Sequence, residues 1–316
     1  MRQKAIYART IERRPSLRSI ALNALLRLTM RERLTHDADL VALRRKYGKL
    51  DARKFPPDVD VTRTPVDCGA VPAEWLSVRE SRQERVLLYL HGGSFAFHFP
   101  HAYAALTARM CRRLGARALI PDYRLAPEHP FPAAPDDCEA AYRWLLGAGV
   151  DPANIVIAGD SAGGNLALVT LQRARAAQLP RPACAVLLSP ALDCTLSSPS
   201  MAAHEGSDPL LLLANLLVLR GYYVASPHDY TNPEVSPLFA DFRGFPPLLL
   251  QVGTREMLRD EATRAAQKAH AAGVDVELEL WPGAAHVFQI ADFLPESTHA
   301  INNIVRFVRI RTGWNC

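Results

Sequence analysis

The chain has 316 residues, of which 49% are hydrophobic and 22% are charged, a composition typical of a globular protein that can bury a large core. Its formal charge of +5 comes from 37 basic and 32 acidic residues, and the basic residues are scattered along the chain. This distribution argues against a nucleic-acid partner, which would require a clustered basic face.

Residues 1–55 are rich in arginine and predict two helices. In the first helix, apolar side chains recur at helical spacing and form one apolar face. These side chains are Leu17, Ile20, Ala21, Ala24, Leu25 and Leu28. The second helix is expected over about 37–46. An amphipathic segment of this kind can meet a membrane, a partner or its own chain, and we expect the commonest outcome, packing on its own chain.

Residues 20–30 also resemble the apolar core of a signal peptide. However, Arg27 interrupts them, a long polar-rich stretch precedes them, and no small-residue cleavage site follows. We therefore expect neither a signal peptide nor a membrane span, and we expect the protein in the cytoplasm.

Beyond Pro56-Pro57, short apolar runs alternate with helical patterns. The predicted strands are 85–90, 116–121, 154–159, 183–189 and 247–252. The predicted helices are 102–114, 135–146, 162–177 and 259–272. Apolar strands alternating with helices are typical of a parallel sheet that is covered on both faces and joined by right-handed crossovers. The fold class is therefore α/β.

Residues 196–232 interrupt this alternation. They begin with polar residues and then carry an apolar run over 210–219. We interpret this segment as an insertion that joins residues 1–55 in a helical cap. The core is then expected in two parts, 56–195 and 233–316.

The segment Gly159-Asp160-Ser161-Ala162-Gly163 matches the pattern G-x-S-x-G. It lies between a predicted strand and a predicted helix, the context in which a serine occupies a sharp turn and acts as a nucleophile. The glycines allow close approach of the backbone, and the start of the helix favours developing negative charge. The pattern therefore predicts Ser161 as a nucleophile rather than as part of an incidental turn.

A second glycine-containing loop, His91-Gly92-Gly93-Ser94, directly follows the strand 85–90. Backbone N–H groups in such a loop can point at the oxyanion of an acyl-transfer reaction. We predict an oxyanion hole made of the N–H groups of Gly92, Gly93 and Ala162. We expect the side chain of His91 to order the loop and to take no part in the chemistry.

A base and an acid follow later in the chain, in the order typical of this arrangement. His286 lies on a loop after the β-like stretch 274–281, where a base is expected. Glu256 stands where the chain leaves the strand 247–252, and Asp260 follows one helical turn later. We favour Glu256 over Asp260 as the acid that fixes the tautomer of His286.

Four stretches together resemble the hormone-sensitive lipase group of bacterial esterases, whose relatives include plant carboxylesterases and gibberellin receptors. They are HGGSF at 91–95, DYRLAPEHPFPAAPDD at 122–137, GDSAGGN at 159–165 and GAAHVF at 283–288. The resemblance covers roughly residues 60–312. It implies an α/β-hydrolase fold: a mostly parallel eight-stranded sheet flanked by helices, with a helical cap. It also implies an acyl-enzyme mechanism with Ser161, Glu256 and His286 as the triad.

The chain departs from the family pattern at two positions. Ser94 replaces the third glycine of HGGG, which leaves the first two N–H donors in place. The acid is Glu256 where many members have aspartate, so its side chain is one methylene longer.

The resemblance implies a hydrolase for short- to medium-chain carboxylic esters that uses no metal and no organic cofactor. The six cysteines agree with the absence of a metal, because they show no CxxC or zinc-type spacing. Lactone, amide or carbamate hydrolysis and deacetylation share the acyl-transfer step and stay open. A ligand receptor is disfavoured because His286 is present, whereas the gibberellin receptors lack this histidine.

Assembly is a further expectation from the family. Its members often dimerise through the last strand and helix at a sheet edge, which correspond to 274–281 and 298–311 here. The sequence neither requires nor excludes such a homodimer.

Overall fold

The structure is a computed structural model that describes residues 7–31, 33–35 and 38–315. The strands are β1 (Ala8–Thr10), β2 (Val61–Cys68), β3 (Val71–Val78), β4 (Val86–Leu90), β5 (Arg117–Pro121), β6 (Ile155–Asp160), β7 (Cys184–Leu188), β8 (Leu248–Gly253) and β9 (Val276–Trp281). Over the described ranges these nine strands form one sheet in the order β1-β9-β8-β7-β6-β4-β5-β3-β2. Neighbouring strands are parallel except in the pairs β2–β3 and β3–β5.

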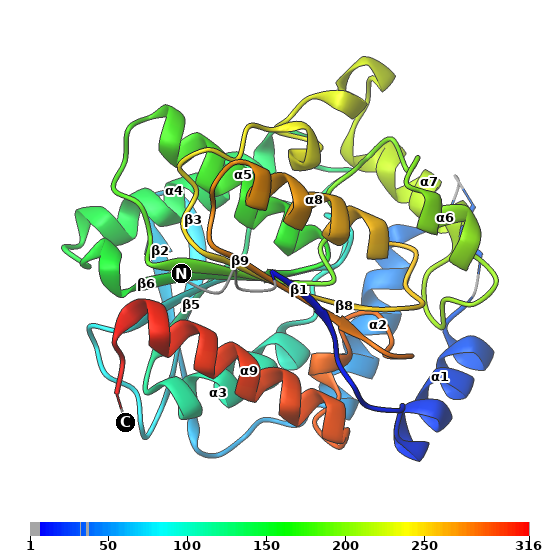
Figure 1. Cartoon of the computed structure of the whole chain (residues 1–316), viewed down its shortest axis with the longest axis horizontal. Coiled ribbons are helices and arrows are strands. Elements are labelled where there is room, and N and C mark those ends of the chain that lie inside the picture. The colour runs from blue at the N-terminus through cyan, green and yellow to red at the C-terminus, as the bar shows by residue number, and fades with distance from the viewer. Residues whose placement is uncertain (1–6, 32, 36–37, 316) are drawn as a thin grey trace, which may run out of the picture.

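Helices lie on both faces of the sheet and at one end of the molecule. They are α1 (Leu17–Thr29), α2 (Leu40–Lys54), α3 (Pro100–Leu114), α4 (Ala133–Gly147), α5 (Ala162–Ala176), α6 (Pro199–His204), α7 (Leu213–Tyr223), α8 (Arg259–Ala271) and α9 (Pro295–Thr312). Figure 1 shows α4, α5 and α8 on one face and α3 and α9 on the other. The two main hydrophobic clusters fill the spaces between the sheet and these two layers. All residues of β4, β6, β7 and β8 are buried, as expected for strands covered on both sides.

The predicted α/β fold is confirmed. The five predicted strands correspond to β4–β8, and the four predicted helices correspond to α3, α4, α5 and α8. The hairpin of β2 and β3 was not predicted. Most side chains of β2 are exposed, so its sequence carries little of the apolar signal that marks the central strands.

The sheet differs by one strand from the eight expected, because β1 adds a ninth. Residues 1–55 were expected to be helical, but Ala8–Thr10 pairs in parallel with Leu278–Leu280 of β9. Arg9 in β1 also forms an ion pair with the buried Glu279 of β9. The stretch 274–281 was expected at the sheet edge, yet β1 covers part of β9 on that side.

Figure 1 shows α1, α2, α6 and α7 gathered at one end of the molecule. The second predicted helix, 37–46, is longer than expected and begins later, as Leu40–Lys54, while position 37 lies outside the described residues. Within the part of the chain that the structure describes, no helix is both long and apolar enough to cross a membrane. The division into a cap of 1–55 and 196–232 and a core of 56–195 and 233–316 stays a prediction.

One expectation about α1 is wrong. Its apolar face was expected to pack on the chain, but all six side chains of that face are exposed. The opposite face packs inward instead, where Leu22 contacts a cluster that includes Trp281 and Phe288.

Candidate active site

Ser161 lies at the turn between β6 and α5, with a φ of 51° and a ψ of −118°. Non-glycine residues seldom adopt a positive φ, so the surrounding packing must hold this turn in place. Gly163 permits the turn, because a Cβ there would lie 1.9 Å from the carbonyl oxygen of Leu90. The turn thus places Ser161 at the carboxyl end of the central strand, where it lines a cavity.

His286 and Glu256 come to the same end of the sheet from the loops after β9 and β8. The Nδ1 of His286 lies 2.8 Å from Oε2 of Glu256. The other carboxylate oxygen of Glu256 accepts hydrogen bonds from the hydroxyl of Ser189 at 2.8 Å and from the N–H of Gly253 at 2.6 Å. Glu256 is fully buried, and His286 lines the same cavity as Ser161. A hydrogen on Nδ1 that faces Glu256 leaves the Nε2 of His286 free to accept a proton.

The charge state of His286 follows from these contacts. Burial lowers the pKa of His286, but the hydrogen bond and the negative charge of Glu256 raise it, with smaller contributions from Asp208 and Asp160. The net result is a pKa above the usual value for histidine. The site is therefore suited to stabilise an imidazolium during a proton transfer.

Asp260, the alternative acid, takes no part in this arrangement. Its carboxylate accepts from Nε of Arg259 at 2.9 Å, and its N–H donates to the hydroxyl of Ser200 at 3.0 Å. The structure therefore brings Glu256, and not Asp260, to His286.

Two polar residues that support the site were missed from the sequence. Ser189 follows β7, donates to Glu256 and accepts from the N–H of Val287 at 3.2 Å. Asp208, buried between α6 and α7, accepts from the N–H of Met257 at 2.9 Å and so ties the insertion to the loop of Glu256. Ser189 had one signal, its position at the end of the predicted strand 183–189, whereas no local pattern singles out Asp208.

The loop after β4 requires a correction at Gly92. Its N–H was predicted to face an oxyanion, but it donates to Oδ1 of Asp160 at 3.0 Å. The same oxygen accepts from the hydroxyl of Tyr89 at 2.7 Å. Burial raises the pKa of Asp160 to about 6, although these two hydrogen bonds and the charge of His286 oppose that shift. The N–H of Gly92 therefore anchors the loop to Asp160 and is not directed at an oxyanion.

The next residues of the loop face the cavity. Gly93 and Ser94 line it together with Ala162. Gly93 has a φ of 107°, and a Cβ there would lie 2.1 Å from the carbonyl oxygen of Phe97, so only glycine fits. Across the described residues, the N–H groups of Gly93, Ser94 and Ala162 donate to no protein acceptor. These three donors are therefore available to a bound oxyanion.

His91 is buried beneath this loop. Its Nδ1 lies 2.7 Å from the carbonyl oxygen of Gly92, and its ring stacks on those of His98 and Tyr123 at centroid distances of 4.3 and 4.1 Å. Burial, together with the nearby His98, lowers the pKa of His91 well below its usual value, so the ring is neutral. These contacts agree with the expected role of ordering the loop.

His91, His98 and Asp122 also lie close enough together to be considered as metal ligands. The rings of His91 and His98 are stacked with an interplanar angle of 14°. A metal ion lies in the plane of each imidazole that binds it, and two stacked, nearly parallel planes share no such position. Asp122 instead pairs with His98 at 3.1 Å. The cluster therefore supports no metal site.

The cavity that contains Ser161 and His286 has a volume of about 320 Å³. Its walls are largely apolar and come from several parts of the chain. Met30 and Leu34 come from the N-terminal segment, Leu216 and Leu219 from α7, and Phe95 from the loop after β4. A cavity of this kind suits an apolar group held against a polar reaction centre.

Comparisons with known proteins agree with the observed fold. A family model described as the alpha/beta hydrolase fold matches residues 87–290. An acetyl-hydrolase of Streptomyces hygroscopicus is 42% identical over 250 residues, which cover 78% of this chain and 83% of the relative. The carboxylesterase/phospholipase LipF of Mycobacterium tuberculosis is 33% identical over 299 residues, which cover 91% of this chain and 80% of the relative.

Two solved structures are similar over 94% of this chain and 99% of their own. The crystal structure of EstE5 soaked with ethyl alcohol has a TM-score of 0.89 and 35% sequence identity. The crystal structure of an esterase from the bacterial hormone-sensitive lipase family has a TM-score of 0.87 and 37% identity.

Proposed function

This chain belongs to the α/β-hydrolase family, in the hormone-sensitive lipase group of bacterial esterases, and we propose that it hydrolyses short- to medium-chain carboxylic esters through Ser161, His286 and Glu256. It is a serine carboxylesterase. The observation that carries the residue assignment is the position of Ser161 and His286 on one cavity, with Glu256 2.8 Å behind His286.

The proposed reaction has two steps. Nε2 of His286 takes the proton of Ser161, whose oxygen attacks the ester carbonyl. The oxyanion binds the N–H groups of Gly93, Ser94 and Ala162. His286 then donates the proton to the departing alcohol, and water activated by His286 releases the acid from Ser161.

The first test is the substitution Ser161→Ala. Removing the nucleophile is expected to abolish hydrolysis of p-nitrophenyl butyrate and labelling by a fluorophosphonate, while circular dichroism stays unchanged. Ser197→Ala, which alters an exposed serine of the insertion, is the matched control and should retain both properties. Turnover by the Ser161→Ala protein at the wild-type rate would refute the assignment.

Hydrolysis of an amide, lactone or carbamate uses the same steps, as does deacetylation, so the machinery alone does not select among them. We propose carboxylic esters because the relatives named above are esterases and an acetyl-hydrolase. Matched ester and amide substrates with the same acyl group would test this choice, and faster amide turnover would contradict it.

We further propose that the reaction needs no metal or organic cofactor, that no nucleic acid takes part, and that the enzyme is cytoplasmic. A homodimer through the last strand and helix also stays a proposal. Because β1 covers Leu278–Leu280 of β9, such a dimer would contact β1 and α9 rather than an open β9 edge. Sedimentation at micromolar concentration tests it, and a monomeric profile would contradict it.

A further inference from the structure

Helix α1 exposes a continuous apolar face, here called the α1 stripe. Its members are Leu17, Ile20, Ala21, Ala24, Leu25 and Leu28. The exposed fractions are 85% for Leu17, 53% for Ile20, 54% for Leu25 and 85% for Leu28. Single exposed apolar residues are common on proteins, but a continuous exposed patch marks an interaction site.

Contacts on the opposite face hold α1 in this orientation. Ser19 is buried, and Nδ2 of Asn23 donates to the carbonyl oxygen of Gly283 at 2.7 Å. At the start of the helix, Ser16 donates from its N–H to Oε1 of Glu296 at 2.6 Å and from its hydroxyl to Oε2 at 3.0 Å. These contacts fix the helix with Ser19, Leu22 and Asn23 inward and the α1 stripe outward, so α1 exposes an apolar face that a surface helix usually buries.

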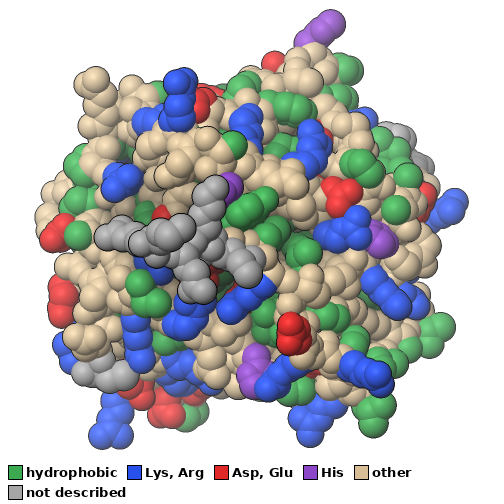
Figure 2. All heavy atoms as spheres, in the orientation of Figure 1, with side chains coloured by type: hydrophobic (Ala, Val, Ile, Leu, Met, Phe, Trp, Pro, Cys, Tyr) green, Lys and Arg blue, Asp and Glu red, His purple; other side chains and the backbone are tan. Residues whose placement is uncertain are grey.

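Positive charge surrounds the stripe. At about 100° per residue, Arg18 and Arg27 fall on opposite flanks of the apolar arc. From Arg13 to Arg31 the sequence contains five arginines and no acidic residue. Figure 2 shows hydrophobic and basic side chains together at the lower right, where Figure 1 places α1.

The apolar surface continues beyond the helix. Arg18 donates from Nη1 to the carbonyl oxygen of Phe293 at 2.9 Å, which places Phe293 beside the start of α1. The side chain of Phe293 is 51% exposed. Aromatic and leucine side chains bordered by arginines are typical of helices that lie in the plane of a membrane interface.

We propose that the α1 stripe docks this enzyme on an anionic phospholipid surface, with the leucines entering the acyl boundary and the flanking arginines contacting lipid phosphates. The charge pattern favours lipid over a second copy of the chain. A twofold contact places the same patch on both partners, so it would bring arginines against arginines with no acidic residue of α1 between them.

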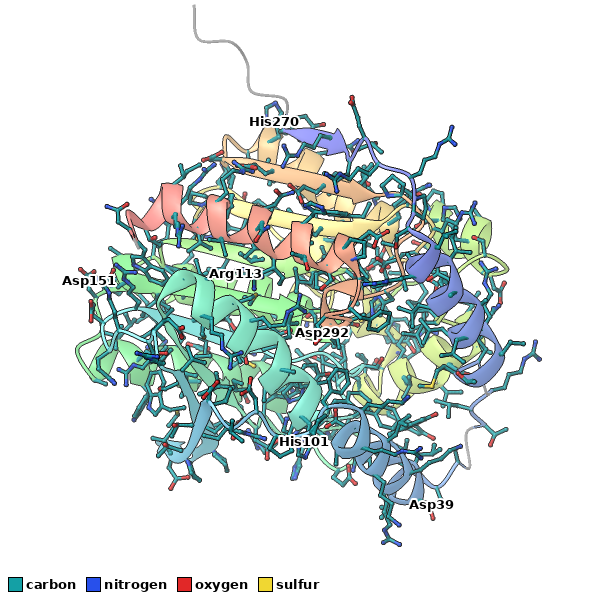
Figure 3. The ribbon with its side chains drawn as sticks, turned by 90° about the horizontal axis from the view of Figure 1, so that it is seen from below. Asp39, His101, Arg113, Asp151, His270 and Asp292 are labelled. Atoms are coloured by element: carbon teal, nitrogen blue, oxygen red, sulfur yellow. The ribbon has the colours of Figure 1, made fainter. Side chains whose placement is uncertain are left out.

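The position of α1 relative to the cavity adds a consequence. Met30 and Leu34, which follow the helix, line the cavity that contains Ser161. Figure 3 shows α1 at the periphery of the molecule, outside the layers that cover the sheet. A docked α1 would therefore hold the cavity beside the lipid surface. Docking itself does not depend on the proposed hydrolysis, because no residue of the α1 stripe lines the cavity.

The test is flotation of the full chain with vesicles. Vesicles of 70% phosphatidylcholine and 30% phosphatidylglycerol should bind the wild type at least tenfold more tightly than pure phosphatidylcholine vesicles, and added salt should weaken the binding. The double variant Leu17→Gln/Leu28→Gln should lose at least tenfold in affinity. Val59→Gln is the matched control, because Val59 is 98% exposed but lies outside α1.

Hydrolysis of soluble p-nitrophenyl butyrate is measured in parallel and should be equal in all three proteins, since the α1 stripe is not part of the reaction centre. Equal binding to both vesicle types, or equal binding by the double variant, would overturn the proposal. So would a dimer in sedimentation that the double variant abolishes without any vesicle binding, because the stripe would then be covered by a second copy.

Discussion

Asp160 occupies a variable position of the G-x-S-x-G pattern, yet it links the nucleophile turn to the loop of the oxyanion hole. Its carboxylate is buried, accepts from Tyr89 and fixes the N–H of Gly92. Burial makes this carboxyl keep its proton more strongly than an exposed one, although its hydrogen-bond donors oppose that effect. The pKa of about 6 for Asp160 therefore makes it a source of pH-dependent stability.

The direction of that dependence follows from the raised pKa. The unfolded carboxyl titrates near its ordinary value of 3.8, whereas the folded one titrates near 6. The contribution of Asp160 to stability is thus complete below the unfolded pKa and is lost as pH rises through the folded pKa. The whole shift corresponds to about 3 kcal/mol, of which about half is lost between pH 5 and 8.

Asp160→Asn removes this titration and retains an oxygen that can accept from Tyr89 and Gly92. The difference in the free energy of unfolding between variant and wild type should therefore move in favour of the variant by about 1–1.5 kcal/mol from pH 5 to pH 8. Urea unfolding at each pH measures this difference. A difference that is constant over the range would show that Asp160 is already ionised at pH 5.

Glu256 should control both the rate and its pH dependence. Glu256→Gln removes the charge that raises the pKa of His286, so burial should lower that pKa and move the acid limb of kcat/KM to lower pH. It also removes the acceptor that selects the tautomer, so kcat should fall by about 10³ to 10⁴. The measurement is a pH–rate profile with p-nitrophenyl butyrate.

Glu256→Asp separates the two effects of the preceding substitution. It retains the negative charge but shortens the side chain, so it should lose activity. The acid limb of its kcat/KM profile should lie at a higher pH than that of Glu256→Gln. An acid limb at the same pH in both variants would indicate that the charge of Glu256 does not set the pKa of His286.

The order and context of the motifs were sufficient to select the residues that the structure brings together at the cavity. The motifs were not sufficient to predict which backbone N–H groups face the oxyanion, because an N–H group that already donates to another acceptor in the protein is not available. The partner of Gly92 is Asp160, which lies 68 residues away in the sequence. No local pattern encodes such a contact, whereas the positive φ of Gly93 and its close approach to Phe97 explain why that glycine is required.

Strands and helices with a clear pattern of apolar residues were predictable from the sequence. Strands that form only because they pair with a distant strand were not. The central strands β4–β8 are short stretches of mostly apolar residues, so the sequence alone predicts that they are buried. By contrast, β1 has only three residues and exists as a strand through its pairing with β9. The hairpin of β2 and β3 lies at the other edge, where exposed positions interrupt the pattern.

One buried carboxylate contributes to the attachment of α2 to the core. Asp51, in α2, accepts from the N–H groups of His101 and Ala102 at 2.9 Å each. These groups open α3, whose preceding residue Phe99 provides no side-chain cap. Figure 3 shows the His101 end of α3 beside α2, with Asp39 at the start of α2. The side chain of Asp51 in α2 thus caps the start of α3.

Asp51→Ala should therefore lower the free energy of unfolding by about 2–3 kcal/mol, because it leaves two N–H groups without a charged acceptor. The control is Asp39→Ala, which removes the exposed cap that accepts from Ala42 at the start of α2 and should cost about 1 kcal/mol or less. Urea unfolding measures both. Equal losses would mean that Asp51 acts as an ordinary surface cap.

At the scale of the whole molecule, the sequence predicted which helices are amphipathic but not what their apolar faces meet. The periodicity of α1 is the same whether its leucines pack on the sheet or face outward. The outcome depends on contacts far along the chain, such as those of Ser16 with Glu296 and of Asn23 with Gly283. The local sequence pattern does not predict tertiary contacts of this kind.

The size of the cavity should limit the acyl group. At about 320 Å³ it lies near the lower end of the range for ligand pockets, and leucines of the insertion line it. Among p-nitrophenyl esters, kcat/KM should therefore be highest for short to medium chains and at least tenfold lower for palmitate. A steady rise from butyrate to palmitate would contradict this limit.

Leu216→Ala tests whether the insertion sets that limit, because Leu216 lines the cavity. Removing its side chain should shift the optimum toward longer acyl groups and leave acetate hydrolysis nearly unchanged, since only long chains reach the space that is opened. Leu217→Ala is the matched control, because this neighbouring leucine of α7 is 41% exposed and does not line the cavity. If both variants kept the wild-type chain-length profile, the acyl limit would have to be set by the core rather than by α7.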